Sequence, residues 1–332
     1  MTTDAELIEV WRGDILESRH RGYVAICGPD GALIDAWGEP DTVILPRSSC
    51  KMIQALPLIE SGAAEAHGLT ERHLALSCAS HEGARLHTDF VSAWLSDLGL
   101  TDNDLICGPQ PPREKDAKFE LIRAHESPCR VHNNCSGKHA GFLTLAKHLD
   151  APLDYVALDN PVQLGCRAAI EELTQVRVEG HGIDGCSAPN FPTSVHGLAR
   201  AMAFFAAAGT RSDARSKAAV RLRDAMVAHP DLVAGEGHAV TELMRACGGR
   251  AAVKNGADGV YTAILPDRGI GAAIKITDGA DRGANCLIAA LLVRLGVLDP
   301  AHPIAIRYTT GPVTNWAGNA VGRLQPVAGI TG

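Results

Sequence analysis

Aromatic residues, basic stretches and long apolar runs are all scarce in this sequence. Aromatic side chains make up only 4% of the 332 residues, so platforms that stack nucleic-acid bases are not expected. The net charge is −7 and no basic stretch is present, which argues against nucleic-acid binding. The longest apolar stretch, residues 284–298, is short and contains Arg294. It predicts a buried helix and not a membrane span.

The sequence also lacks a secretory leader and CxxC pairs. Its first residues, MTTDAELIEV, are acidic and have no positively charged leader before an apolar run, so we expect a cytoplasmic protein. Its ten cysteines should then stay reduced. Most of them, such as Cys27, Cys166 and Cys286, lie in apolar runs and are interpreted as small buried hydrophobic residues. Without CxxC spacing, neither a redox motif nor a standard zinc knuckle is predicted.

The chain is rich enough in hydrophobic residues, at 46%, to bury a sizeable core. Short apolar runs in residues 22–45 and 251–279 predict strands, and helical periodicity dominates between them. Regular strand–helix alternation is missing, which argues against a doubly wound sheet. We therefore predict an α/β protein of the α+β kind, with an antiparallel sheet from both chain ends and an inserted helical lobe. This single two-lobed catalytic unit has a sheet lobe at roughly 1–46 plus 176–332 and a helical lobe at roughly 47–175.

Local signals refine the expected elements. Residues 48–62 predict a helix with a kink or early end at Pro57. Asn160 followed by Pro161 predicts the start of another helix, because asparagine caps helices and proline suits the first turn. After residue 296 the sequence predicts a tail rich in glycine and proline.

The stretch RSSCKMIQALP places Ser48 three residues before Lys51. Residues at this spacing share one helix face, so the hydroxyl and the amine can meet. A neutral lysine amine can remove the proton of a serine nucleophile. The alternative is a helix-capping serine beside a solvated lysine, and the S-x-x-K pattern alone does not decide between them.

Two further residues stand in an order typical of serine acyl-transfer enzymes with an S-x-x-K motif. Ser80 is expected at the end of a helix in the helical middle, and Lys254 stands just before a late strand. Taken singly, each could be an ordinary helix-end serine or turn lysine. The ordered set favours a second serine–lysine pair.

The stretch HNNCSGKHAGF repeats the three-residue spacing with Cys135 and Lys138, and Cys186 lies farther on among turn residues. Two thiolates could hold zinc, although lysine is an unusual third ligand. By spacing alone, buried thiols are the favoured interpretation. The stretch HEGARLH, residues 81–87, is not an H-E-x-x-H zinc motif, because position 85 is arginine.

These motifs resemble those of the Rhizobium-type L-asparaginases, also called the asparaginase II family. The resemblance covers almost the whole chain. It is carried by RGDILESRHRG, GEPDTVILPRSSCKMIQALPLIESGAA, LSCASHEGARLHTDFV, CGPQPP, HNNCSGKHAGFL, GIDGCSAPNFP and KNGADGV. It implies a fold similar to that of serine β-lactamases and glutaminases, a homodimer, and hydrolysis of L-asparagine to L-aspartate and ammonia.

The resemblance also implies roles for individual residues. Ser48 would be the nucleophile and Lys51 its base, with Ser80 and Lys254 as a second pair facing the first. One zinc would be held by Cys135, Lys138 and Cys186.

Three neighbouring residues are expected around the substrate. Asp184 would lie beside the zinc, and Arg47 and His139 are candidates for gripping the substrate, with surface or structural roles as their alternatives. Two other functions stay open: a β-lactamase-like serine hydrolase acting on another amide, and a non-enzymatic zinc- or thiol-binding protein.

Overall fold

The computed structural model describes residues 4–331, which form two compact units. The sheet unit contains the residues up to Ser49, Thr193–Ala207 and the residues from Glu242 onward. The helical unit contains Cys50–Pro192 and Ala208–Thr241. Residues 176–192 and 208–241 thus belong to the helical unit, whereas the sequence prediction assigned them to the sheet lobe.

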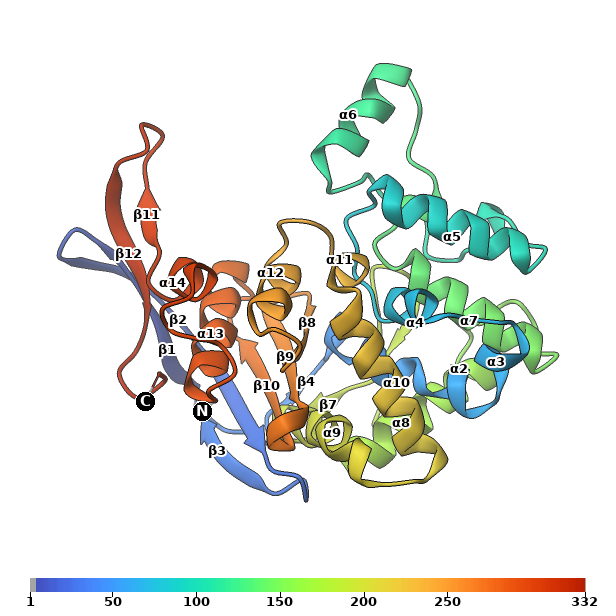
Figure 1. Cartoon of the computed structure of the whole chain (residues 1–332), viewed down its shortest axis with the longest axis horizontal. Coiled ribbons are helices and arrows are strands. Elements are labelled where there is room, and N and C mark those ends of the chain that lie inside the picture. Colours follow the sequence, from blue (N-terminus) through green and yellow to red (C-terminus); the bar gives the residue numbers. More distant parts are fainter. Residues whose placement is uncertain (1–3, 332) are drawn as a thin grey trace. The chain divides into compact units, whose positions relative to one another are not determined.

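The sheet unit is built on one antiparallel sheet whose strands come from both ends of the chain (Figure 1). The strand order is β11-β12-β1-β2-β10-β9-β8, and β3 pairs with β2. The bounds are β1 Ala5–Arg12, β2 Ile15–Cys27, β3 Leu33–Trp37, β8 Ala252–Gly256, β9 Val260–Leu265, β10 Ile270–Ile276, β11 Pro312–Thr314 and β12 Ala320–Pro326. A separate short pair joins β4 (Val43–Ile44) to β7 (Thr193–Ser194). The predicted antiparallel sheet from both chain ends is confirmed.

Helices cover both faces of this sheet. The Cys27 thiol of β2 contacts the backbone of α9 (Val195–Ala207) at the carbonyl of His196. His20, an odd number of residues away on the same strand, packs against Gly283 of α13 (Asp281–Arg294). Because side chains alternate between faces along a strand, α9 and α13 lie on opposite faces. This explains the unbroken buried run from residue 22 to 27.

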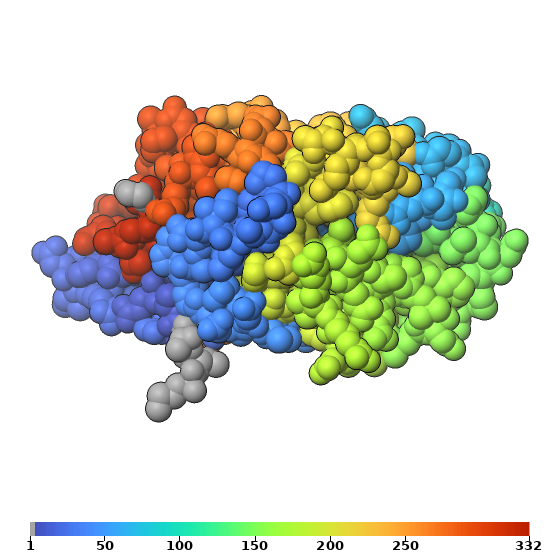
Figure 2. Space-filling view, turned by 90° about the horizontal axis from the view of Figure 1, so that it is seen from below, coloured from blue at the N-terminus to red at the C-terminus, as the bar shows by residue number. Residues whose placement is uncertain are grey.

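The prediction that a tail closes the chain after residue 296 is wrong. Residues after 296 form α14 (Pro303–Thr309) and the strands β11 and β12. In Figure 2 the blue N-terminal strands and the red C-terminal residues adjoin on the surface, and β12 pairs with β1 in register from Ile8–Pro326 to Arg12–Gly322. β1 was also missed. β1 and β12 are each weakly patterned alone, and one of the two partners of each lies more than 300 residues away in the sequence.

The helical unit consists of short and medium helices. Their bounds are α1 Lys51–Gln54, α2 Leu56–Glu60, α3 Ala63–Ala66, α4 Glu71–Ser77, α5 Arg85–Asp97, α6 Lys115–Ala124, α7 Ser136–His148, α8 Pro161–Thr174, α10 Ala214–Ala228 and α11 Pro230–Val233. A two-stranded pair, β5 (Gly182–Ile183) with β6 (Pro189–Asn190), follows α8. The helix α12 (Ala239–Ala246) spans the limit between the units.

The core of the helical unit is organised around α7, which is buried along most of its length. Gly137 lets α7 approach α4 closely, because a Cβ there would lie 2.5 Å from the Leu76 carbonyl oxygen. Asn160 caps α8 as predicted, accepting a hydrogen bond from the Val162 amide at 3.0 Å. These contacts set the position of the first turn of α7, which carries several predicted site residues.

The predicted helix at residues 48–62 is divided into three parts. A 3₁₀ turn, η1 (Arg47–Cys50), leads into α1, and a new helix, α2, begins after Ala55. Pro57 lies in the first turn of α2, where its missing N–H costs no helical hydrogen bond. The expected break near Pro57 is therefore confirmed. Within residues 4–331, no helix has the length and apolarity needed to span a membrane.

Candidate functional site

The turn that carries Ser48 is held firmly against the sheet of its own unit. The Ser49 hydroxyl donates to the Pro46 carbonyl at 2.7 Å, and Thr262 Oγ1 on β9 donates to the Ser49 carbonyl at 3.0 Å. Gly256 on β8 makes room for this approach, since a Cβ there would lie 2.7 Å from the Pro46 oxygen and 2.9 Å from the Ser49 nitrogen. Ser48 itself is half-buried. Its position is thus fixed by backbone contacts on both sides.

Arg47, directly before Ser48, adopts a left-handed backbone conformation with φ 53°. This conformation is uncommon for residues other than glycine and occurs often at functional turns. Its guanidinium forms an ion pair with Asp258, 2.7 Å away in the β8–β9 hairpin. Asp258 and Gly259, both at positive φ, give the Asp-Gly signal typical of tight hairpins.

Lys254 lies on β8 of the same sheet, directly opposite Thr262 in the ladder. Its side chain is buried, and Nζ donates to the carbonyl and side-chain oxygens of Asn255 at 2.8 and 3.0 Å. Thr262 Oγ1 also lies 3.3 Å from the Lys254 carbonyl. One threonine hydroxyl therefore links the Ser48 turn to the strand of Lys254. The sequence placed Lys254 just before a late strand, and the structure shows it within β8, directly ahead of β9.

In the helical unit, Lys51 is the centre of a buried polar cluster. It is 1% exposed. Its Nζ donates to the Ala79 carbonyl, to Ser80 Oγ at 3.0 Å and to Cys135 Sγ at 3.2 Å. The bond between Lys51 and Ser80 was not predicted, because 29 residues separate the two and sequence spacing alone gives no sign of it. Ser80 lies in the loop after α4 and not at the helix end itself.

The three predicted zinc ligands also gather in the helical unit. Cys135 caps the N-terminus of α7, Lys138 lies in its first turn, and Cys186 lies in the turn between β5 and β6. Lys138 Nζ donates to Cys186 Sγ at 3.2 Å. Cys135 Sγ also lies 3.0 Å from Asn134 Oδ1. All three ligand side chains are buried, at 3–5% exposure.

The pKa values of the Cys135 and Cys186 thiols are shifted in opposite directions. A hydrogen bond from Cys135, aided by the nearby Lys138 ammonium, lowers the pKa of Cys186 to about 4. The same hydrogen bond and burial raise the pKa of Cys135 to about 12. Although burial opposes the charge on Lys138, the thiols and Asp184 raise its pKa. The pair therefore shares one proton, and Cys186 is the thiolate.

This donor set fits a soft metal ion such as zinc. A thiolate, a second thiol and a lysine amine converge in a buried position, and thiolate sulfur is a preferred zinc ligand. Among the His, Cys, Asp and Glu side chains of residues 4–331, no three come together as a metal site. Lysine would therefore have to complete the set by giving up its proton, as metal binding requires of its ligands.

His139 has one ring nitrogen without a partner among the described residues. Its Nδ1 lies 2.8 Å from the Tyr155 hydroxyl, and that hydroxyl oxygen accepts the Ile106 amide at 2.6 Å. The Tyr155 hydroxyl keeps its own proton to donate to Nδ1, and this arrangement places the His139 proton on Nε2. This buried Nε2 has no hydrogen-bond partner within residues 4–331. Such an orphan donor is suited to a ligand.

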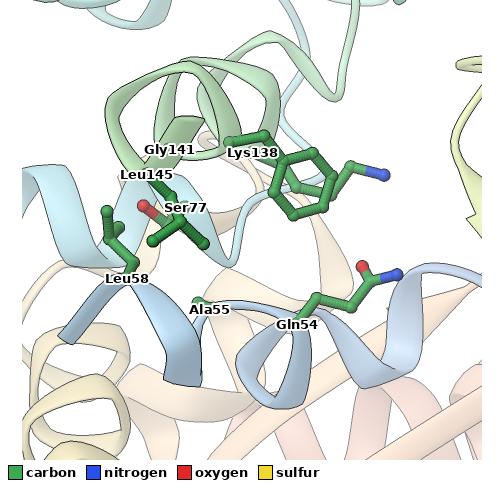
Figure 3. A pocket seen from close by; sticks show the side chains of 8 residues that line it. Gln54, Ala55, Leu58, Ser77, Lys138, Gly141 and Leu145 are labelled. Carbon is green, nitrogen blue, oxygen red and sulfur yellow. The ribbon is translucent and has the colours of Figure 1, made fainter. Parts of the chain in front are cut away.

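A small pocket lies against the side chain of Lys138. Figure 3 shows the polar ends of Lys138 and Gln54 on one side of it, away from Leu58 and Leu145. Ser77, Gly141 and Phe142 are also among its lining residues. Lys138 is thus one wall of the pocket, and its ammonium donates to Cys186, which is not among the lining residues.

The predicted residues are thus divided between the units. Arg47, Ser48 and Lys254 belong to the sheet unit. The helical unit holds the others, namely Lys51, Ser80, Cys135, Lys138, His139, Asp184 and Cys186. Sequence reasoning missed Tyr155 and Thr262, whose roles depend on contacts across the fold. Nothing in their local sequence could have indicated these contacts.

Comparison with known families identifies the chain. Residues 8–326 match the family described as L-asparaginase II, so the protein belongs to that family. No curated protein matches the chain.

Solved structures similar to the chain include glutaminases and β-lactamases. Mglu in its tris and glutamate form is 14% identical over 80% of this chain with a TM-score of 0.43, and the chain spans only 57% of the length of that protein. A β-lactamase from Mycobacterium bovis is 15% identical over 80% of this chain and 90% of its own, with a TM-score of 0.45. A Bacillus glutaminase is 13% identical over 79% and 85%, with a TM-score of 0.42.

Proposed function

We propose that the protein is an L-asparaginase that hydrolyses L-asparagine to L-aspartate and ammonia. The observation that carries the proposal is the buried contact of Lys51 with Ser80 and Cys135, in a chain of the L-asparaginase II family. A buried lysine is costly unless it is paired. Its three contacts therefore point to a polar site within an otherwise apolar unit.

In the proposed mechanism Ser48 is the nucleophile. Its Oγ attacks the side-chain amide carbon of asparagine, and its proton passes to Lys51, three residues along the chain. The C–N bond then breaks, the leaving nitrogen takes a proton and departs as ammonia, and an aspartyl ester of Ser48 remains. Water hydrolyses the ester, which releases aspartate and restores the serine.

The Lys51 contacts suggest a path for protons. As an ammonium, Lys51 directs its three N–H bonds to Ala79, Ser80 and Cys135, so it must release one proton before it can accept another. A hydroxyl both donates and accepts, so Ser80 is suited to relay that proton. We assign Lys254 to Ser80 as its partner, in keeping with the second pair implied by the family resemblance.

Substrate binding is assigned to groups around the thiols. Under this proposal Cys135, Lys138 and Cys186 would hold zinc, which when bound would orient the α-amino and carboxylate groups of the substrate. His139 offers its unpartnered Nε2–H, and Asp184 and Arg47 supply charges of opposite sign. Because two sulfur ligands make an electron-rich site, orienting the substrate suits the metal better than activating water.

The test is ammonia release from L-asparagine by the purified, zinc-loaded protein, with Ser48→Ala as the matched control. We expect activity that falls by at least about 10³-fold in the variant, because the covalent route is lost. Mass spectrometry of wild type quenched during turnover should show an added aspartyl group, absent from Ser48→Ala. Ser48→Ala that keeps most of the wild-type rate would overturn the nucleophile assignment.

Other substrates separate the alternatives. Acylation by a β-lactam without asparagine turnover would support a β-lactamase-like hydrolase, and zinc binding without any amide hydrolysis would support a binding protein. The predicted homodimer belongs to the proposal, and light scattering of the purified protein tests it.

A further inference from the structure

The two histidines of the stretch HEGARLH form a buried pair that the mechanism above does not use. The rings of His81 and His87 are stacked 4.7 Å apart and within 8° of parallel. Both side chains are fully buried in the helical unit. His87 bonds the Asp231 carbonyl through Nε2 at 2.9 Å, which ties it to α11. His81 bonds elsewhere, toward α7.

The contacts of His81 fix its tautomer. Its Nδ1 accepts the Gly83 amide at 3.1 Å, so that nitrogen carries no proton. Its Nε2 lies 2.9 Å from Ser136 Oγ, and Ser136 donates its own proton to the Val131 carbonyl at 2.9 Å. Since Ser136 has only one proton, its oxygen accepts from His81. The ring is therefore a neutral Nε2–H donor.

The loop of residues 79–83, called here the Ser80 loop, presents two oxygen acceptors to Lys51. These are the Ala79 carbonyl and Ser80 Oγ. The loop backbone is held by hydrogen bonds from the Ser80 amide to Val233, from the His81 amide to Asn134, and from the amides of residues 113 and 114 to the carbonyl of residue 82. The His81 side chain adds a further bond, to Ser136, the first residue of α7 and the neighbour of Cys135.

We propose that His81 is a positioning residue whose bond to Ser136 holds the Ser80 loop in place against the start of α7. This inference rests on the proposed function. This bond keeps Ser80 within hydrogen-bond reach of Lys51, while Cys135 reaches the same amine from the other side. Displacing a catalytic group by about 1 Å can reduce turnover about 10²-fold. The His81–Ser136 bond therefore affects the chemical step and, much less, substrate binding.

The test uses variants that keep or remove this one bond. His81→Gln keeps an N–H donor at the far end of the side chain, whereas His81→Asn is too short to reach Ser136. Ser136→Ala removes the acceptor. His87→Asn is the matched control, because it disturbs the same stacked pair but leaves both partners of the His81–Ser136 bond in place. Each variant is compared by kcat and KM for L-asparagine, corrected for the folded fraction.

We expect His81→Asn and Ser136→Ala to lower kcat about 10- to 100-fold with KM changed less than about threefold. The double variant should be no worse than either single one, because both remove the same interaction. His81→Gln should recover most of kcat. His87→Asn should lower Tm and leave kcat within about twofold. Equal losses in His81→Gln and His81→Asn, or additive losses in the double variant, would overturn the proposal.

A spectroscopic measurement tests the His81–Ser136 bond independently of turnover. Long-range ¹H–¹⁵N correlation of labelled histidine should show His81 as the Nε2–H tautomer with a slowly exchanging proton, and Ser136→Ala should abolish that protection. A wild type that hydrolyses no asparagine would contradict the proposed function, and this spectrum would then test the His81–Ser136 bond by itself. An Nδ1–H tautomer for His81 would contradict the proposed His81–Ser136 bond.

Discussion

Three lysines in this protein are buried almost completely, and their partners determine what each can do. Lys51 bonds a hydroxyl, a carbonyl and a thiol, whereas Lys138 bonds a thiolate and Lys254 bonds Asn255. A buried lysine without partners would lose its charge or destabilise the fold. We therefore assign different roles to the three lysines: Lys51 to proton transfer, Lys138 to metal binding, and Lys254 to the second serine–lysine pair.

The first prediction concerns the metal. Removal of zinc by a chelator should raise KM for L-asparagine more than it lowers kcat, because the proposed role of zinc is to orient the substrate. Steady-state kinetics before and after chelation, with zinc added back as the control, measure the two effects. A large fall in kcat at saturating asparagine would instead assign the metal a direct part in the chemical step.

The second prediction concerns Tyr155. Tyr155→Phe leaves the Ile106 amide and His139 Nδ1 without their partner, which should cost about 1–3 kcal/mol of unfolding free energy. His139 would also lose its fixed tautomer, so KM should rise several-fold while kcat changes little. Urea unfolding and kinetics measure these effects. An unchanged KM would show that His139 does not donate to the substrate.

At the scale of elements, the Ser48 turn depends on the β8–β9 hairpin. The close approach at Gly256 and the hydroxyl of Thr262 hold the turn on the strand of Lys254. The left-handed Arg47 is stabilised there by its ion pair with Asp258, which lies in the hairpin. The hairpin therefore positions the turn before any substrate binds.

The third prediction follows from these contacts. Gly256→Ala should displace the Ser48 turn, lowering stability by about 1–3 kcal/mol and kcat at least tenfold. Thr262→Val, which keeps the shape but removes the hydroxyl, should cost about 1 kcal/mol. Thermal unfolding and kcat are measured for both. If Gly256→Ala kept wild-type kcat, the turn would not depend on this contact.

At the scale of the whole molecule, buried histidines link stability to pH. Burial is the main cause that lowers the pKa of His81, His87 and His139 from the ordinary value of 6.5. Their unfolded forms gain protons below pH 6.5 while the folded forms stay neutral. Their contribution to stability is therefore complete above pH 6.5 and is lost as the pH falls below that value.

The fourth prediction tests this linkage. The free energy of unfolding should fall as the pH decreases from 6.5 toward 5, by up to about 1.4 kcal/mol per pH unit for each histidine. Urea unfolding across this range measures the slope. His81→Gln should reduce the slope by about one proton, and an unchanged slope in this variant would contradict the assignment of a neutral His81.

The sequence by itself determined the family, the antiparallel sheet from both chain ends, the long helices and the break near Pro57. These features follow from motifs, local periodicity and turn residues, which act over short distances along the chain. The candidate residues were also predicted from sequence, because their spacing and order match the family motifs.

Only the tertiary structure decided which of these side chains meet. The bonds of Lys51 to Ser80 and Cys135, of His139 to Tyr155 and of His81 to Ser136 join segments far apart in the sequence. The strands β1 and β12 escaped prediction for the same reason, since each is stabilised by pairing with the other. Contacts of this kind depend on how distant segments pack, and local sequence carries no record of that packing.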